Sequence, residues 1–149
     1  MSINQIQDEI IEEFELLDDW MDRYELLIDL GKSLEPFADE ERNEQNLIDG
    51  CQSKVWFVAK MEKDEAGKQI IVYRGDSDAI LVKGIVALLI RVMSGHSPEE
   101  ILNADLYFID KINLREHLSP TRSNGLAAML KQMKLYALAF SSSSSSSEV

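Results

Sequence analysis

The chain has 149 residues, of which 45% are hydrophobic and 28% are charged, and its 27 acidic and 15 basic residues give a formal net charge of −12. This length and composition suit a single globular domain that can bury a core of its own. The strong negative charge disfavours nucleic-acid binding, which needs clustered basic groups, and favours a protein partner with a complementary surface.

The apolar stretches and the single cysteine bear on the cellular compartment. The longest apolar stretch, residues 79–93, contains Lys83 and Arg91 and is shorter than the about 20 residues that a membrane helix needs. No basic region precedes an apolar segment at the start of the sequence, so we expect no secretion signal. One cysteine, Cys51, cannot form an internal disulfide. We therefore expect a cytoplasmic protein that does not insert into membranes.

The first thirty residues have a helical period. Ser2 and Gln5 have the spacing of a capping box. The apolar residues that follow recur at steps of three and four, which predicts one amphipathic helix, or two in series, ending at Gly31. They are Ile3, Ile6, Ile10, Phe14, Leu17, Met21, Tyr24 and Ile28. Residues 32–50 lack this pattern, and we expect mostly loop with one helical turn.

The next segment reads as a hairpin. Residues 54–61 and 69–75 are rich in β-branched and aromatic side chains and are separated by turn-forming residues. This pattern predicts two antiparallel strands. We expect Trp56 to lie in or near the core.

A long apolar helix is predicted after the hairpin. Asp76, Ser77 or Asp78 is expected to cap a helix that spans residues 79–95 and ends at Gly95. Because this helix is apolar on nearly all sides, we expect it to lie buried at the centre of the domain.

The last third of the chain is predicted to be helical with loops between the helices. The sequence "SPEE" at 97–100 has the cap, proline and capping-box glutamate of a helix start. A loop through residues 105–110 and a short helix near 114–117 are expected to follow. Residues 119–125, in which Asn124 and Gly125 are expected to serve turn geometry, then lead into a final helix over residues 126–140. Seven consecutive serines follow Phe140, and such low complexity favours disorder. We therefore predict one domain over residues 1–140 and a disordered tail over residues 141–149.

Cys51 is the candidate functional residue. It lies at the polar edge of the apolar strand segment, between Gly50 and the small polar pair Gln52 and Ser53. An accessible loop position suits a reactive thiol, whereas a free cysteine with no chemical role is usually a small buried hydrophobe.

The rest of the sequence limits what this thiol can do. A zinc or iron–sulfur site needs three or four ligands, and only His96 and His117 could join Cys51 and carboxylates, so we expect no metal site. A cysteine hydrolase needs a histidine beside its thiol, but both histidines lie next to predicted helix ends, where we expect them at the surface. The remaining possibility is that the thiol accepts a group from another protein or gives one to it.

Two alternatives stay open at this point. One is a regulatory binding module in which the cysteine is incidental. The other is a cysteine-dependent enzyme that acts on a small molecule with the help of His96 or His117. The first predicts partner effects that do not depend on Cys51, and the second predicts activity of the chain alone.

Three blocks, "GCQSKVW" (50–56), "GDSDAILVKGIVALL" (75–89) and "LSPTRSNGL" (118–126), resemble the signature blocks of the SufE family in order and spacing. The resemblance extends from the first helix to Phe140. It implies an α+β fold in which a small antiparallel sheet packs against several helices, similar to the IscU scaffolds. Those scaffolds hold clusters with several cysteines, whereas a chain with one cysteine can carry sulfur but lacks cluster ligands.

The resemblance also implies a function. Members of the SufE family accept sulfur from cysteine desulfurases that contain pyridoxal phosphate. Cys51 is therefore expected to take persulfide sulfur from a SufS-like desulfurase, to stimulate that enzyme and to pass the sulfur on to a scaffold for iron–sulfur cluster assembly. The chain itself is expected to bind no cofactor, because the pyridoxal phosphate belongs to the desulfurase.

The same blocks suggest supporting residues for Cys51. Those expected to shape the segment around it are Gly50, Gln52 and Ser53. Arg122 matches an arginine of the third block, and is expected either to act on the thiolate or the partner or simply to tie down its own loop. Asp76 and Asp78 match an acidic turn of the family, and are expected either to cap the following helix or to contact the partner.

Overall fold

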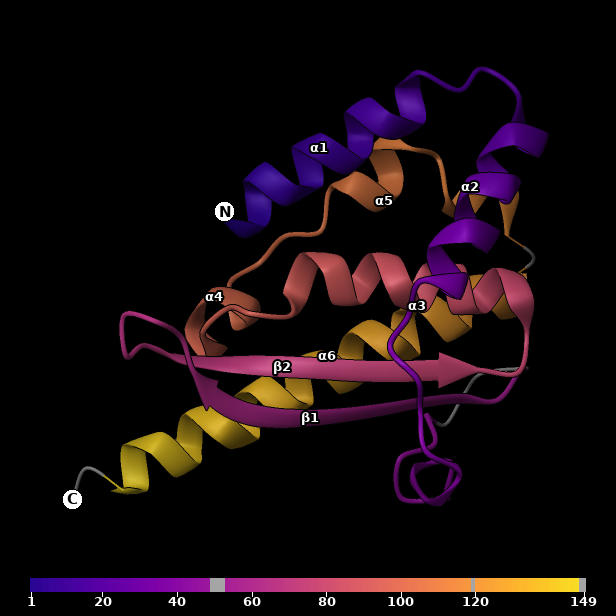
Figure 1. The fold of residues 1–149 in the computed structure, drawn as a ribbon. Coiled ribbons are helices and arrows are strands. Elements are labelled where there is room, and N and C mark those ends of the chain that lie inside the picture. The colour runs from indigo at the N-terminus through magenta and orange to yellow at the C-terminus, as the bar shows by residue number, and fades with distance from the viewer. Residues whose placement is uncertain (49–52, 119, 148–149) are drawn as a thin grey trace.

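The computed structural model describes residues 1–48, 53–118 and 120–147. They form an α+β domain around a two-stranded antiparallel sheet, as predicted (Figure 1). Helices α3 (Ile80–Met93) and α6 (Pro120–Ser147) both pack on the hairpin, and α1 (Ile3–Glu15) and α2 (Trp20–Lys32) cover α3. Within these ranges no helix is both long and apolar enough to cross a membrane.

The N-terminal stripe forms two helices, and the predicted capping box is present. The Gln5 backbone N–H donates to Ser2 Oγ at 3.1 Å, and the Ser2 N–H donates back to Gln5 Oε1 at 2.9 Å. Ile10 and Phe14 are buried at the expected spacing. Between α2 and Ile48 the chain is irregular except for one 3₁₀ turn, η1 (Asp39–Glu41), and an isolated bridge at Leu47, which confirms the loop with one helical turn predicted over these residues.

Gly31 does not end α2, which corrects the prediction. It lies inside the helix, one residue before the last, because α2 crosses α3 closely at this point. A Cβ atom placed on Gly31 would lie 2.9 Å from the Gly84 backbone nitrogen, and one placed on Gly84 would lie 2.1 Å from the Leu27 carbonyl oxygen. The two glycines therefore allow the helix backbones to touch.

The hairpin consists of β1 (Val55–Lys63) and β2 (Gln69–Ser77), with Trp56 opposite Asp76. Trp56 is 9% exposed, which confirms its place near the core. The central helix α3 is buried along most of its length, also as predicted.

The start of α3 differs from the prediction. Ala79 occupies the N-cap position, and no side chain caps the helix there. Asp76 and Ser77 belong to β2, and the Asp78 side chain accepts a hydrogen bond from the Lys54 N–H at 3.0 Å. Strand pairing and the contact with Lys54 thus occupy the residues that we expected to serve as caps.

The C-terminal elements follow the prediction in part. Helix α4 (Pro98–Leu102) begins with the predicted cap and capping box, and the short turn η2 (Arg115–His117) lies where a short helix was expected. Helix α5 (Phe108–Lys111) was not predicted. Helix α6 starts at Pro120, which suits the first turn of a helix. It therefore begins before the predicted start at residue 126, and the turn geometry predicted for Asn124 and Gly125 is wrong. The helix also continues through Ser147, where we expected disorder, and extending an existing helix costs little per residue.

Glu100 is expected to make the stability of this region depend on pH. Its carboxylate pairs with Lys68 and accepts from the Ser97 N–H at 3.2 Å. The hydrogen bond from Lys68, helped by Ser97, outweighs burial and lowers the pKa of Glu100 from 4.5 to about 2. A pKa lowered by folding adds stability above the unfolded value of 4.5, and this stability is lost as the pH falls toward 2. Since the side chain is 36% exposed, we expect about 1 kcal/mol at most.

The measurement is urea unfolding of the Glu100→Gln variant across this pH range. The variant should be less stable than the parent at neutral pH, and the difference should vanish in acid. Glu99→Gln is the matched control, because it removes the same charge from the neighbouring exposed residue. Equal losses in the two variants, or a difference that grows in acid, would contradict the assignment.

Candidate functional site

The site is the segment of residues 49–54, which carries Cys51 and is called the Cys51 segment below. Gly50, Cys51 and Gln52 lie outside the described residues. Ser53 is described and is half-buried. The site is therefore described through the residues that contact the two ends of this segment.

The two ends are paired with each other. The Ile48 N–H donates to the Val55 carbonyl oxygen at 2.8 Å, and Leu47 forms an isolated antiparallel bridge with Trp56. Residues 47–48 thus run alongside the first residues of β1. The residues on the two sides of the Cys51 segment, called the leaving end (up to Ile48) and the re-entry end (from Lys54), are therefore adjacent in the fold.

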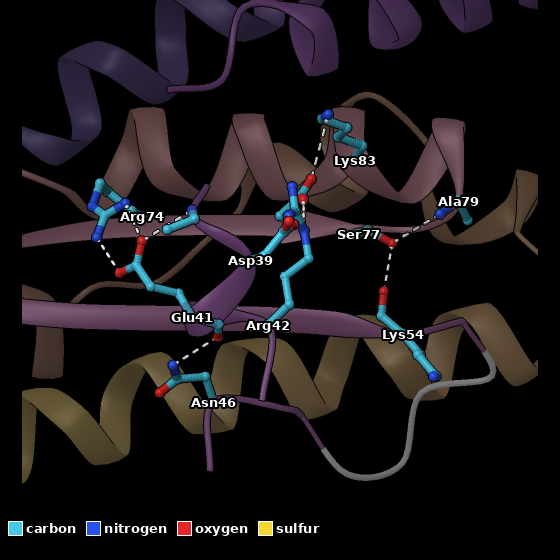
Figure 2. A network of polar contacts seen from close by, with 11 residues as sticks. Asp39, Glu41, Arg42, Asn46, Lys54, Arg74, Ser77, Ala79 and Lys83 are labelled. Carbon is cyan, nitrogen blue, oxygen red and sulfur yellow. Dashed lines mark hydrogen bonds and ion pairs between the residues drawn. The ribbon is translucent and has the colours of Figure 1, made fainter. Parts of the chain in front are cut away.

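The re-entry end is held by the end of β2. The Ser77 hydroxyl donates to the Lys54 carbonyl oxygen at 2.8 Å and accepts from the Ala79 N–H at 3.2 Å (Figure 2). Lys54 also exchanges hydrogen bonds with Asp78, whose backbone N–H donates to the same carbonyl at 3.2 Å. The first and second sequence blocks therefore meet at Lys54.

The leaving end is held by an arginine from the loop after α2. Arg42 donates through Nε to Asp76 Oδ2 at 2.9 Å and pairs through Nη1 with Asp39. Its guanidinium carbon also lies 6.0 Å from the centre of the Phe37 ring, within the range of a cation–π contact. Arg42 thereby ties the chain leading to Ile48 to the same end of β2.

A second arginine supports the same loop from the middle of β2. Arg74 forms a two-pronged ion pair with Glu41, with Nη1 3.0 Å from Oε1, and its guanidinium carbon lies 5.5 Å from the centre of the Phe37 ring. Glu41 in turn accepts through its backbone oxygen from the Asn46 side chain at 2.9 Å (Figure 2). A planar guanidinium paired with a carboxylate in this way fixes orientation as well as distance.

Asp76 is the buried centre of this network, with 5% of its surface exposed. Burial raises the pKa of its carboxyl group, but hydrogen bonds from Arg42 and the Ser77 backbone, together with the charge of Lys83, outweigh burial and leave the pKa below its ordinary value. Lys83 Nζ lies 3.3 Å from Oδ1, although Oδ1 has no hydrogen-bond partner within the described residues. Asp76 is therefore an ionised, enclosed carboxylate facing two cations, and Asp78 is the exposed member of the pair.

The remaining predicted residues lie elsewhere or outside the description. The backbone of Arg122 lies in the first turn of α6, but its side chain is outside the described part. His96 is not at the surface, which corrects the prediction: it is 7% exposed, and its Nε2 lies 2.9 Å from the Met1 carbonyl oxygen. His117 lies in η2, and its side chain is not described. Across residues 1–48, 53–118 and 120–147 no three His, Cys, Asp or Glu side chains are placed to share a metal ion.

The sequence did not point to Arg42, Glu41 or Arg74. All three interact across a loop and a strand that lie more than thirty positions apart in the chain. The signal for Arg42 was weak: it is a single cation within the acidic run "ADEERNE" that was read as loop. The described contacts thus connect the residues on both sides of the segment that contains Cys51 to the end of β2.

Comparison with known proteins gives matches over most of the chain. The sequence model of the family described as "SufE: Fe-S metabolism associated domain" matches residues 8–137. The chain is 44% identical over 128 residues to an uncharacterized SufE-like protein of Rhizobium etli, covering 85% of this chain and 86% of the relative. It is 41% identical over 128 residues to an uncharacterized SufE-like protein of Rhizobium meliloti, covering 85% and 91%.

The fold is also similar to a solved one. The solution structure of a hypothetical protein from Thermus thermophilus superposes with a TM-score of 0.67 and 24% identity, over 90% of this chain and 94% of that protein. At this identity the likeness concerns the fold, and it agrees with the small sheet packed against helices.

Proposed function

Because this chain belongs to the SufE family and so has a role in iron–sulfur metabolism, we propose that it carries sulfur. Cys51 takes the terminal sulfur of a persulfide from a cysteine desulfurase and delivers it for cluster assembly. The observation that carries the proposal is the pairing of Ile48 with Val55, which holds both ends of a segment with the only cysteine of the chain.

The transfer is an exchange between sulfur atoms. The Cys51 thiolate attacks the outer sulfur of the donor persulfide, a new S–S bond forms on Cys51, and the S–S bond of the donor breaks. The donor cysteine leaves as a thiolate, and the proton of the persulfide stays with the transferred sulfur. No external oxidant or reductant is needed. A second exchange of the same kind, with a thiolate of the next acceptor, delivers the sulfur.

The ionisation of the Cys51 thiol sets how fast this exchange can proceed. An ordinary cysteine is only a few per cent thiolate at pH 7, so contact with a positive group at the partner's site would speed the attack.

The partner is proposed to be a desulfurase that contains pyridoxal phosphate, and the carrier is proposed to bind no cofactor itself. Stimulation follows from the exchange, since removing the persulfide frees the desulfurase cysteine for another cycle. We further propose that both proteins act in the cytoplasm, where thiols stay reduced.

The test is the rate of sulfide release from L-cysteine by a purified SufS-like desulfurase in the presence of reductant. Adding this chain should raise the rate severalfold and in a saturable manner. The same amount of an unrelated acidic protein controls for non-specific effects. An unchanged rate at saturating concentrations of the folded chain would contradict the proposal.

A further inference from the structure

We propose that Arg42 is a positioning residue for sulfur transfer, which fixes the loop leading to Cys51 through its ion pair with Asp76. This inference rests on the proposed function, and it assigns a role to a residue of the loop that leads to the Cys51 segment.

Both ends of the Cys51 segment are held by three consecutive residues. On the leaving side, Arg42 ties the loop to Asp76 at 2.9 Å. On the re-entry side, Ser77 and Asp78 hold Lys54 at 2.8 and 3.0 Å. The end of β2 therefore sets where the two ends stand relative to each other (Figure 2).

Among the contacts made at the end of β2, the one with Arg42 joins the loop to a buried carboxylate, that of Asp76. Asp76 is enclosed, and its Oδ2 receives the Arg42 hydrogen bond. Its other oxygen is buried without a hydrogen bond from the described residues, with Lys83 Nζ at 3.3 Å. A buried carboxylate is costly unless it is paired, so the fold strongly favours the state in which Arg42 is docked. Docking of Arg42 in turn ties the loop that leads to Ile48 to the end of β2.

Thiol exchange depends on such placement. The attacking sulfur must approach the donor S–S bond in line and at contact distance, and a misplacement of about 1 Å can lower a rate about 100-fold. Loss of the ion pair should thus slow the transfer step more than it weakens association with the partner, because only 33% of the Arg42 side chain is exposed.

The experiment compares Arg42→Gln with Arg91→Gln. Both changes remove an arginine that pairs with a carboxylate, and the two arginine side chains are exposed to the same degree, 33% and 32%. Arg91 lies on α3 and pairs with Glu13 of α1. The rate of persulfide formation on Cys51 is followed by mass spectrometry at several concentrations of persulfidated desulfurase.

We expect Arg42→Gln to lower the maximal transfer rate about 10- to 100-fold with little change in the half-saturating concentration, and Arg91→Gln to leave both near the parent values. Arg42→Lys, which keeps the charge, should recover part of the rate. Equal rates for Arg42→Gln and the parent would overturn the inference, as would equal losses in the two glutamine variants.

Amide hydrogen exchange separates this inference from the proposed function. Arg42→Gln should speed exchange of the Ile48 N–H, which bonds to Val55 in the parent. If the parent accepts no sulfur, the proposed function fails, and unchanged Ile48 exchange would by itself overturn the positioning role. Should Arg42→Gln fail to fold, Asp76→Asn, which removes the charge but keeps the shape, is subject to the same two measurements and the same criteria.

Discussion

Replacing Cys51 with serine is expected to abolish the stimulation of the desulfurase, returning sulfide release to the rate of that enzyme alone. The variant has no thiol left, because Cys51 is the only cysteine. A hydroxyl is not ionised at neutral pH and cannot accept sulfur by exchange. The measurement is the sulfide-release assay, repeated with the variant over the same concentration range.

Binding is the control for this variant. The contacts described at the ends of the segment come from Ile48, Lys54 and the end of β2, and none of these uses the Cys51 side chain. We therefore expect the variant to bind the desulfurase with an affinity within a few-fold of the parent, measured by calorimetry. A serine variant that stimulates as well as the parent would contradict the carrier and favour a regulatory binding module.

Replacing Gly84 with alanine is expected to destabilise the fold strongly, because the added methyl group would collide with the backbone of α2. The new Cβ would lie 2.1 Å from the Leu27 carbonyl oxygen, so α2 and α3 would have to move apart. Overpacking of this kind costs about 3 kcal/mol, of which the better helix propensity of alanine recovers about 1 kcal/mol. Urea unfolding followed by circular dichroism should show a net loss of about 2 kcal/mol or more.

Gly67→Ala is the matched control. Gly67 has a φ of +82°, and nothing lies within 4 Å of a Cβ atom placed there. Its substitution should cost about 1 kcal/mol from backbone strain alone. A Gly84→Ala variant as stable as the parent would show that α2 and α3 do not approach as closely as the structure has them.

Local signals account for the elements that sequence alone could predict. The caps at Ser2 and Ser97, the hairpin and the apolar α3 all depend on residues a few positions apart, and all were confirmed. The features that were missed depend on distant residues. Gly31 looked like a helix stop because the sequence does not show that it packs against Gly84 of another helix. Helix α5 was missed because it starts where the Phe108 N–H donates to Gln7 Oε1 at 3.1 Å, a contact between residues 101 positions apart.

The same distinction holds for the site. Cys51 stood out in the sequence because of its neighbours and its uniqueness, and the motif blocks identified the family. Asp76 looked like a helix cap, whereas in the fold it is a buried partner of Arg42 and Lys83. His96 looked like a terminal residue, but its ring reaches the Met1 carbonyl, 95 positions away. Such pairings depend on how the loop, strand and helices come together in space, which periodicity and composition do not encode.

The most direct measurement is the location of the transferred sulfur. The folded chain is mixed with a SufS-like desulfurase and L-cysteine without reductant, and intact and peptide mass spectra are then recorded. The proposed carrier function predicts a gain of one sulfur atom on the peptide that contains Cys51. Reductant should remove this sulfur, and the Cys51→Ser variant should not gain it. A chain that binds and stimulates the desulfurase but gains no sulfur on Cys51 would contradict it.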